Sequence, residues 1–146
     1  MEIFTIGFTR TTAENFFGRL RENGIERLLD VRLHNRSQLA GFAKERDLAY
    51  FLRELVGAEY EHAPLLAPTQ EILDAYKKKG AMPWAEYERR FNDLITARRI
   101  EVELDRAGFE RRTVLLCSED TPEHCHRRLV AEYLADHWGE VRIVHL

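Results

Sequence analysis

The chain has few of the features that mark secreted, membrane-embedded or disulfide-stapled proteins. Its 146 residues include two cysteines, and no continuous run of about 18 apolar residues predicts a transmembrane helix. Met1 to Phe4 lead directly into a strand, without the basic segment and small-residue cleavage site of a secretory leader. These absences predict a cytoplasmic protein in which Cys117 and Cys125 are thiols, with a disulfide between them as the alternative.

An excess of positive charge is missing as well. The formal net charge is −3 and the pI is about 6.1, whereas a broad nucleic-acid surface needs a basic face. Arginine pairs such as Arg89-Arg90 stand among acidic residues such as Glu86 and Glu88, a pattern typical of solvated helix faces. We therefore expect no membrane partner, and only local contact with any nucleic acid.

Strand-like and helix-like segments alternate along the chain. Five segments are predicted to be strands: Glu2 to Ile6, Ile25 to Val31, Ala58 to His62, Arg111 to Leu116 and Val141 to His145. Five are predicted to be helices: Thr12 to Asn23, Arg46 to Val56, Thr69 to Lys79, Pro83 to Ala107 and Pro122 to His137. The alternation predicts an α/β fold with a mostly parallel sheet of about five strands and helices on both faces.

The length and the apolar content suit a single three-layer domain over residues 1–146. A helical insert of about residues 69–107 lies between the third and fourth predicted strands. It is long for one crossover connection, so a lid or a homodimer contact is a further expectation for it.

The most informative segment joins the fourth predicted strand to the last predicted helix. The strand runs out at Cys117, and Thr121-Pro122 predicts a helix N-cap followed by a first helical residue. Helical periodicity puts His126 near the centre of the apolar face, flanked by Cys125 and Arg127. Because ligands of open α/β sheets bind beyond the carboxyl ends of strands, and helix N-termini attract anions, this segment predicts a functional site.

The other predicted strands add polar residues to the same edge of a parallel sheet. These residues lie at or just after the ends of the strands: Gly7, Thr9, Asp30, Arg32 and His62. Glu119 follows Cys117 in the same way. These residues have structural alternatives: a turn glycine at Gly7, an ion pair between Asp30 and Arg32, and a histidine satisfied at a sheet end at His62. In the Cys117 segment the alternatives are cysteines that pack as small apolar residues, and a core position for His126 in which its ring is hydrogen-bonded to a backbone carbonyl.

Four blocks of the chain resemble the bacterial and archaeal family catalogued as Domain of Unknown Function family 488. They are Phe4-Thr5-Ile6-Gly7, Leu29-Asp30-Val31-Arg32, Tyr60 to Leu65, and Leu116-Cys117-Ser118-Glu119 through Cys125-His126-Arg127. The chain departs from the family at Phe8-Thr9, where His-Ser is frequent, and at Leu65-Leu66-Ala67, where Leu-Gly-Gly is frequent. The resemblance implies a fold class and the positions of a site. It does not identify a reaction, and the cofactor stays unknown.

The first functional hypothesis is an anion-binding site that serves a thiol-dependent enzyme. Arginine next to a thiol, near a helix N-terminus, favours a thiolate nucleophile and grips phosphate or carboxylate. The ligand would be a phosphorylated small molecule, a nucleotide or a nucleic-acid end. The spacing from Cys117 to Arg127 is not the cysteine, five residues, arginine loop of tyrosine phosphatases and rhodaneses. The predicted catalytic residues are Cys117, His126 and Glu119, with His62 as a second proton carrier, and the predicted anion-binding residues are Gly7, Thr9, Asp30, Arg32, His62, Cys125 and Arg127.

Two alternatives belong to other functional classes. One is a zinc or iron site on Cys117, Cys125 and His126, completed by His62 or Glu119, because thiolate and imidazole suit these metals. The other is a noncatalytic interaction domain that uses the predicted helix from Pro83. Its apolar stripe has helical spacing, which is also typical of a core-facing helix, and consists of Trp84, Tyr87, Phe91, Leu94 and Ile95.

Overall fold

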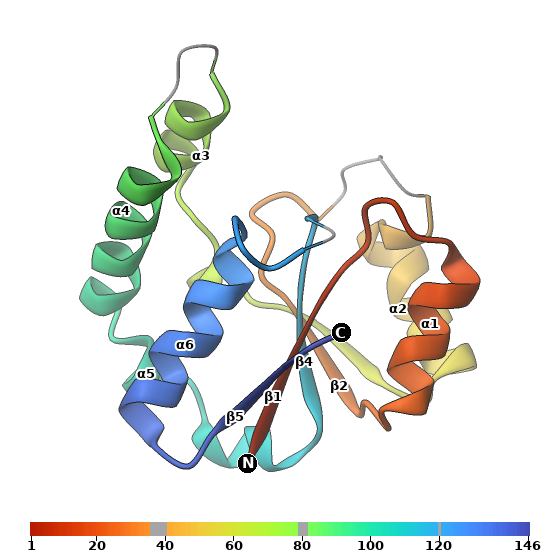
Figure 1. Cartoon of the computed structure of the whole chain (residues 1–146). Coiled ribbons are helices and arrows are strands. Elements are labelled where there is room, and N and C mark those ends of the chain that lie inside the picture. Colours follow the sequence, from red (N-terminus) through yellow and green to blue (C-terminus); the bar gives the residue numbers. More distant parts are fainter. Residues whose placement is uncertain (36–40, 79–81, 120) are drawn as a thin grey trace.

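The computed structural model of the chain describes residues 1–35, 41–78, 82–119 and 121–146. Within these residues one sheet has the strand order β3-β2-β4-β1-β5, and every neighbouring pair is parallel (Figure 1). The predicted α/β fold with a parallel sheet is confirmed. The strands are β1 (Glu2–Gly7), β2 (Arg27–Asp30), β3 (Glu59–His62), β4 (Thr113–Cys117) and β5 (Arg142–His145).

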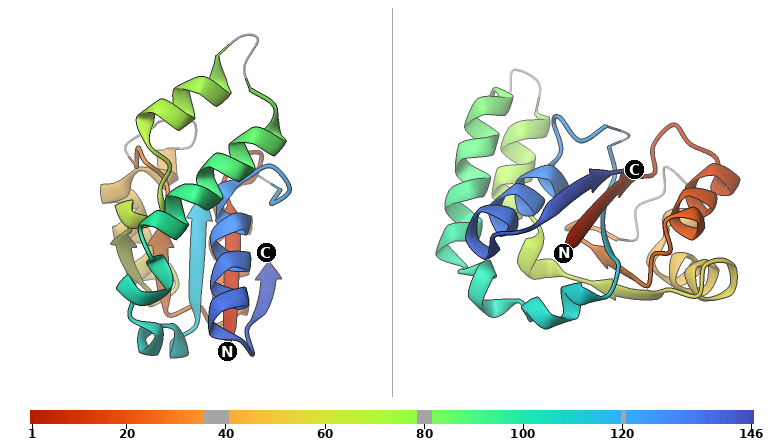
Figure 2. Two further views of the ribbon diagram at one scale, coloured as in Figure 1. Left: turned by 90° about the vertical axis from the view of Figure 1, so that its left-hand side faces the viewer. Right: turned by 60° about the horizontal axis from the view of Figure 1, so that its bottom comes forward.

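Helices cover both faces of the sheet, as predicted. On one face lie α1 (Ala13–Glu22) and α2 (Glu45–Leu55), and on the other lie α4 (Trp84–Ala97), α5 (Ile100–Glu103) and α6 (His126–Trp138) (Figure 1). The remaining helix, α3 (Gln70–Lys77), pairs with α4 at the end of the molecule toward which the strands run (Figure 2). No helix in the described ranges is long and apolar enough to cross a membrane.

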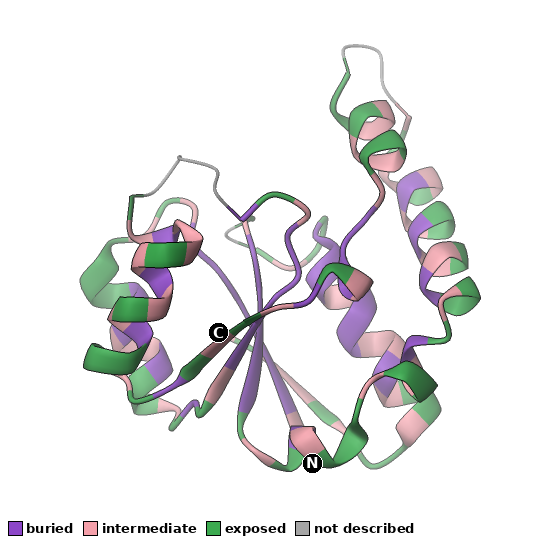
Figure 3. Ribbon diagram, turned by 180° about the vertical axis from the view of Figure 1, so that it is seen from behind, coloured by how far each residue is buried: buried purple, intermediate pink, exposed green. Residues whose placement is uncertain are grey.

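The central strand β4 is buried along its whole length (Figure 3). Its side chains alternate between two apolar layers: Val114 and Leu116 pack in the layer of α1 and α2, and Leu115 and Cys117 in the layer of α4 and α6. A strand buried on both faces is expected to be a continuous apolar run, which explains why this segment lacks polar alternation. The same alternation turns the Cys117 side chain toward α6.

The predicted single helix from Pro83 to Ala107 is wrong. α4 ends at Ala97, Arg99 has a left-handed backbone with φ of 53°, and the short helix α5 begins at Ile100. A 3-10 helix, Arg106–Glu110, then leads into β4. The left-handed residue ends the helical hydrogen bonding and turns the chain, and such a turn leaves little trace in a periodic apolar pattern.

The predicted start of the last helix at Pro122 is also wrong. α6 begins at His126, and Cys125 is extended, with φ of −135° and ψ of 137°. Pro122 instead belongs to a turn, in which its carbonyl oxygen accepts a hydrogen bond from the backbone N–H of Cys125 at 3.2 Å. Because this turn delays the helix by four residues, Cys125 and His126 come to the helix end that faces Cys117.

The sheet topology identifies the position of the site. β2 and β4 are neighbours, and the helices that follow them, α2 and α6, lie on opposite faces of the sheet. In open α/β sheets such a switch point opens a crevice beyond the carboxyl ends of the strands, where ligands bind. Arg32 follows β2, and Cys117 ends β4, so both lie at this point.

Candidate functional site

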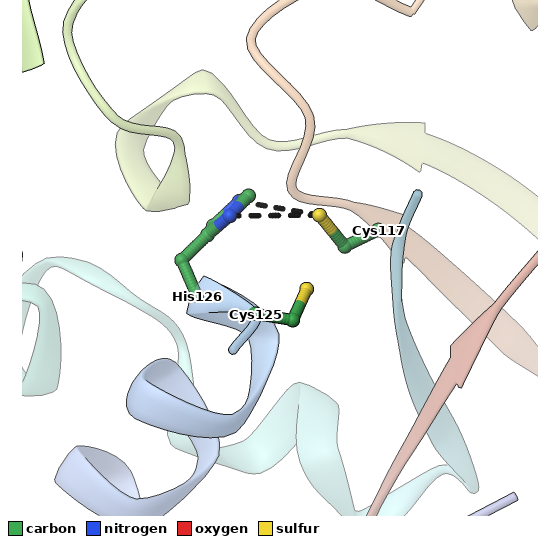
Figure 4. A group of neighbouring side chains, drawn as sticks. All are labelled: Cys117, Cys125 and His126. Atoms are coloured by element: carbon green, nitrogen blue, oxygen red, sulfur yellow. Dashed lines mark hydrogen bonds between the residues drawn. The ribbon is translucent and has the colours of Figure 1, made fainter. Parts of the chain in front are cut away.

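The centre of the site is a buried group of two thiols and one imidazole (Figure 4). Sγ of Cys117 lies 3.5 Å from Nδ1 and 3.8 Å from Nε2 of His126. The ligand-type atoms of Cys117, Cys125 and His126 lie within 4.8 Å of one another, and all three residues are buried. Both cysteines are free thiols, as predicted. The strand end supplies one sulfur and the helix start supplies the other sulfur and the ring.

A hydrogen bond to a backbone carbonyl fixes the ring of His126 and shows which of its nitrogens carries the proton. Nε2 lies 2.7 Å from the carbonyl oxygen of Val31, just beyond β2. A carbonyl oxygen accepts hydrogen bonds and cannot donate them, so Nε2 carries the proton. In the neutral ring the lone pair is therefore on Nδ1, which is the nitrogen nearer to Cys117. A base held by a third group beside a thiol is the arrangement that activates a cysteine nucleophile.

The two cysteines have pKa values that move in opposite directions. The Cys125 thiol donates a hydrogen bond to Cys117 and so lowers the pKa of Cys117, with further lowering by the Ser118 backbone N–H and by Arg127, against the opposing effect of burial. Burial raises the pKa of Cys125 well above its ordinary value, and the interaction with Cys117 raises it further. Cys117 is therefore the more acidic thiol of the pair, and Cys125 is the one that donates to it.

Arg32 lies at the site in a buried ion pair. Its Nε and Nη2 donate to the two carboxylate oxygens of Asp30 at 2.9 and 2.7 Å, and Nη2 also donates to the carbonyl oxygen of Ala43 at 2.7 Å. The remaining nitrogen, Nη1, is buried without a hydrogen-bond partner among the described residues. Burial alone lowers the pKa of Arg32, but Asp30 chiefly, with Tyr60 and Cys117, raises it above its ordinary value.

Two other predicted residues hold Arg32 in place. Asp30 also accepts hydrogen bonds from the Arg32 backbone N–H at 3.1 Å and from the Tyr60 hydroxyl at 2.6 Å. Nε2 of His62 donates to the carbonyl oxygen of Arg32 at 2.8 Å. Neither Asp30 nor His62 lines the pocket described below. The predicted alternative of a structural Asp30–Arg32 pair is thus present in the fold.

The predicted residues Gly7, Thr9 and Arg127 hold the segment that follows Cys117. Thr9 donates to the carbonyl oxygen of Ser118 from its backbone N–H at 3.1 Å and from its hydroxyl. Fully buried Arg127 donates from Nη1 to the carbonyl oxygen of Glu119. A Cβ on Gly7 would overlap that same carbonyl. The contact of Glu119 with Arg127 therefore uses the main-chain carbonyl of Glu119 and not its carboxylate.

A pocket of about 140 Å³ opens between the sheet edge and the α3–α4 hairpin. The sheet-edge side contains the five predicted residues Cys117, Glu119, Cys125, His126 and Arg32. The structure brings these five together around one space. Gly7, Thr9, Asp30, His62 and Arg127 do not line it.

The opposite wall of the pocket consists of aromatic residues for which the sequence predicted no role in the site. Tyr76 of α3 lies 4.7 Å from Tyr87 of α4 between ring centroids, and Trp84 stacks on Tyr87 at 5.0 Å and on His124 at 5.0 Å. Burial first, and then the nearby Cys117 and Cys125, raise the pKa of Tyr87. The helical spacing of Trp84 and Tyr87 was the available signal, and it fitted a core stripe equally well.

The fold and the cluster define the class of protein: a parallel α/β protein with a buried Cys, Cys, His group at the carboxyl edge of its sheet. One family model matches residues 12–134, and its description is "Domain of unknown function DUF488". Since the match spans most of the 146 residues, the chain belongs to this family, and the resemblance seen in the sequence is confirmed. The block Phe4 to Gly7 precedes the matched range. Among curated proteins and among solved structures, none matches the chain.

Proposed function

We propose that the chain is a thiol-dependent enzyme in which Cys117 attacks a small anionic ligand held in the pocket. The observation that carries the proposal is the pairing of Sγ of Cys117 with Nδ1 of His126 at 3.5 Å, in the wall of that pocket. The backbone carbonyl of Val31 orients the ring, so thiol, base and orienting group occur in the order that nucleophilic catalysis uses.

Arg32 is the proposed anion-binding residue. An unpartnered buried N–H of a charged group has an unfavourable free energy of about 1–3 kcal/mol or more, which an acceptor on a ligand would relieve. Nη1 of Arg32 is such a group among the described residues, and Arg32 and Cys117 both line the pocket. A phosphate or carboxylate oxygen at Nη1 would lie next to the nucleophile, which supports an anionic ligand.

The proposed reaction is transfer of a group from the ligand to the Cys117 sulfur. The proton of the thiol passes to Nδ1 of His126, and Sγ forms a bond to the electrophilic atom of the ligand. The bond to the leaving group breaks, the leaving group keeps the electron pair, and it takes the proton from Nδ1. Cys125 stabilises the Cys117 thiolate before attack. Gly7, Thr9 and Arg127 hold the segment after Cys117, while Asp30 and His62 hold Arg32.

The test is the pH dependence of alkylation at both cysteines, read by mass spectrometry on metal-free protein with and without inorganic phosphate. We expect Cys117 to react at a pH below the ordinary cysteine pKa of about 8.5 and to be protected by phosphate. Cys125 is the internal control, since its raised pKa predicts slow reaction. An ordinary pH profile at Cys117 without protection by phosphate would contradict the proposal.

A zinc site on the same three residues is the second candidate, and it is supported by the grouping of their ligand-type atoms within 4.8 Å of one another. Two thiolates and one imidazole are ligands that zinc prefers. The Val31 carbonyl would fix the ring as outer-shell partners of metal-bound histidines do.

Elemental analysis separates the two candidates. Protein purified without a chelator or an affinity tag should contain close to one equivalent of zinc if the metal site is correct, and less than roughly a tenth if Cys117 is a free nucleophile. Cys125→Ser is the matched variant, because it removes one soft ligand while leaving the Cys117–His126 pair. Loss of zinc in this variant would support the metal site.

A further inference from the structure

The α3–α4 hairpin gives the pocket a second kind of surface that the proposed chemistry does not use. α3 contains no buried residue (Figure 3), although the apolar residues Leu73 and Tyr76 belong to it. An amphipathic helix normally buries its apolar face against the protein. Here Leu73, Tyr76 and Trp84 are half-buried and line the pocket. Tyr76 and Trp84 pack partly against the core, and the remainder of their surface is half-buried beside the pocket.

The size of the pocket limits which ligand groups could pack against Leu73, Tyr76 and Trp84. Its volume is about 140 Å³, close to the roughly 150 Å³ of an engineered apolar cavity that binds benzene. Such a space is about the size of one six-membered ring, so a ligand with two ring systems would extend outside it. Tyr76 meets Trp84 edge-on, with centroids 5.8 Å apart and planes at 64°, and an edge-to-face arrangement of this kind is one that aromatic groups prefer. The wall is thus suited to a flat ring.

The charged residues around the pocket indicate the chemical group at the other end of the ligand. Among the described residues that line it, Arg32 and Lys77 are positively charged and Glu119 is negatively charged. Arg32, whose Nη1 is buried without a hydrogen-bond partner among the described residues, belongs to the sheet-edge wall together with Cys117, and the aromatic rings belong to the hairpin wall. A ligand that satisfies both walls has an anionic group at one end and a single aromatic ring at the other.

From this juxtaposition we infer that the substrate class is a small aryl anion, with one aromatic ring against Tyr76 and Trp84 and a phosphate or similar anion at Arg32. This inference rests on the proposed anion site and adds the part of the ligand that the hairpin recognises. Aliphatic anions of the same charge would fill the same volume but would lack the flat π surface that packs against the rings.

Calorimetric titration of metal-free protein with three probes tests the inference: inorganic phosphate, cyclohexyl phosphate and phenyl phosphate. We expect phenyl phosphate to bind roughly tenfold more tightly than phosphate, and more tightly than cyclohexyl phosphate. Trp84→Leu and, as a milder variant, Tyr76→Leu should reduce the preference for phenyl phosphate and leave the affinity for inorganic phosphate nearly unchanged. Tyr50→Leu is the matched control, because Tyr50 is an exposed tyrosine of α2 outside the pocket.

The outcomes separate this inference from the proposed function. If phosphate binds but the three probes have equal affinities, the aryl class is overturned and the anion site stands. If Trp84→Leu and Tyr76→Leu fold but keep the full preference for phenyl phosphate, the hairpin is not the recognition surface. If none of the probes binds at millimolar concentration, the anion site itself is overturned, and the aryl class with it.

Discussion

The ion pair between Asp30 and Arg32 should be one of the most sensitive points of the structure. The side chains are 0% and 4% exposed, and two hydrogen bonds of 2.9 and 2.7 Å join them. Removing one partner of such a buried pair leaves the other charge uncompensated, which costs about 3–5 kcal/mol. Asp30→Asn keeps the size of the side chain and removes its charge, so we expect a loss of that magnitude in the free energy of unfolding.

Urea unfolding measures this loss. With an m-value of about 2 kcal/mol/M, 3–5 kcal/mol lowers the midpoint by roughly 1.5–2.5 M. Tyr60→Phe is the graded comparison, because it removes one hydrogen bond to the same carboxylate and should cost about 1.5–3 kcal/mol. The double variant Asp30→Leu, Arg32→Met should lose less stability than Asp30→Asn alone, since no charge is then left buried.

A small effect would refute this reasoning. If Asp30→Asn lost less than about 1 kcal/mol, the pair would behave as an exposed ion pair does. The Asp30 carboxylate would then not be the group that holds the Arg32 guanidinium in its observed position. The main structural support for an anion site at Nη1 of Arg32 would be lost.

Two further predictions concern the surroundings of Cys117. Cys125→Ala removes the thiol donor that lowers the pKa of Cys117, so the alkylation profile of Cys117 should move to higher pH. Cys125→Ser keeps a hydrogen-bond donor and should move the profile less. Equal shifts in both variants would contradict the assignment of Cys125 as the donor. Gly7→Ala would put a Cβ onto the Glu119 carbonyl oxygen, so we expect a loss of about 1–3 kcal/mol in urea unfolding and slower alkylation of Cys117. Its control is Gly18→Ala within α1, which has open space around the added Cβ and should be stabilising by about 0.5–1 kcal/mol; a Gly7→Ala variant as stable and as reactive as the original chain would be evidence against the close approach.

The periodicity of apolar residues and the positions of the predicted strand ends were sufficient to predict much of the architecture. The alternation of apolar segments indicated the parallel α/β sheet, because each crossover helix must cover a sheet face. Parallel strands share one carboxyl edge, which is why Arg32 and Cys117 could be assigned to the same edge before their contacts were known. The helix starts and stops were less well predicted, since the break at Arg99 and the turn at Pro122 depend on the chain reaching β4 and α6 rather than on local propensity.

The sequence by itself determined the fold class and the edge of the sheet where polar groups gather, because these depend on periodic patterns and on the order of strands and helices along the chain. Only the tertiary structure decided which of those groups meet. It separated residues that line the pocket, such as Cys117 and Arg32, from residues that hold them, such as Asp30 and Arg127. It also brought Trp84 from a distant helix to face the thiols. Contacts between segments far apart in the chain depend on packing, and no local pattern encodes them.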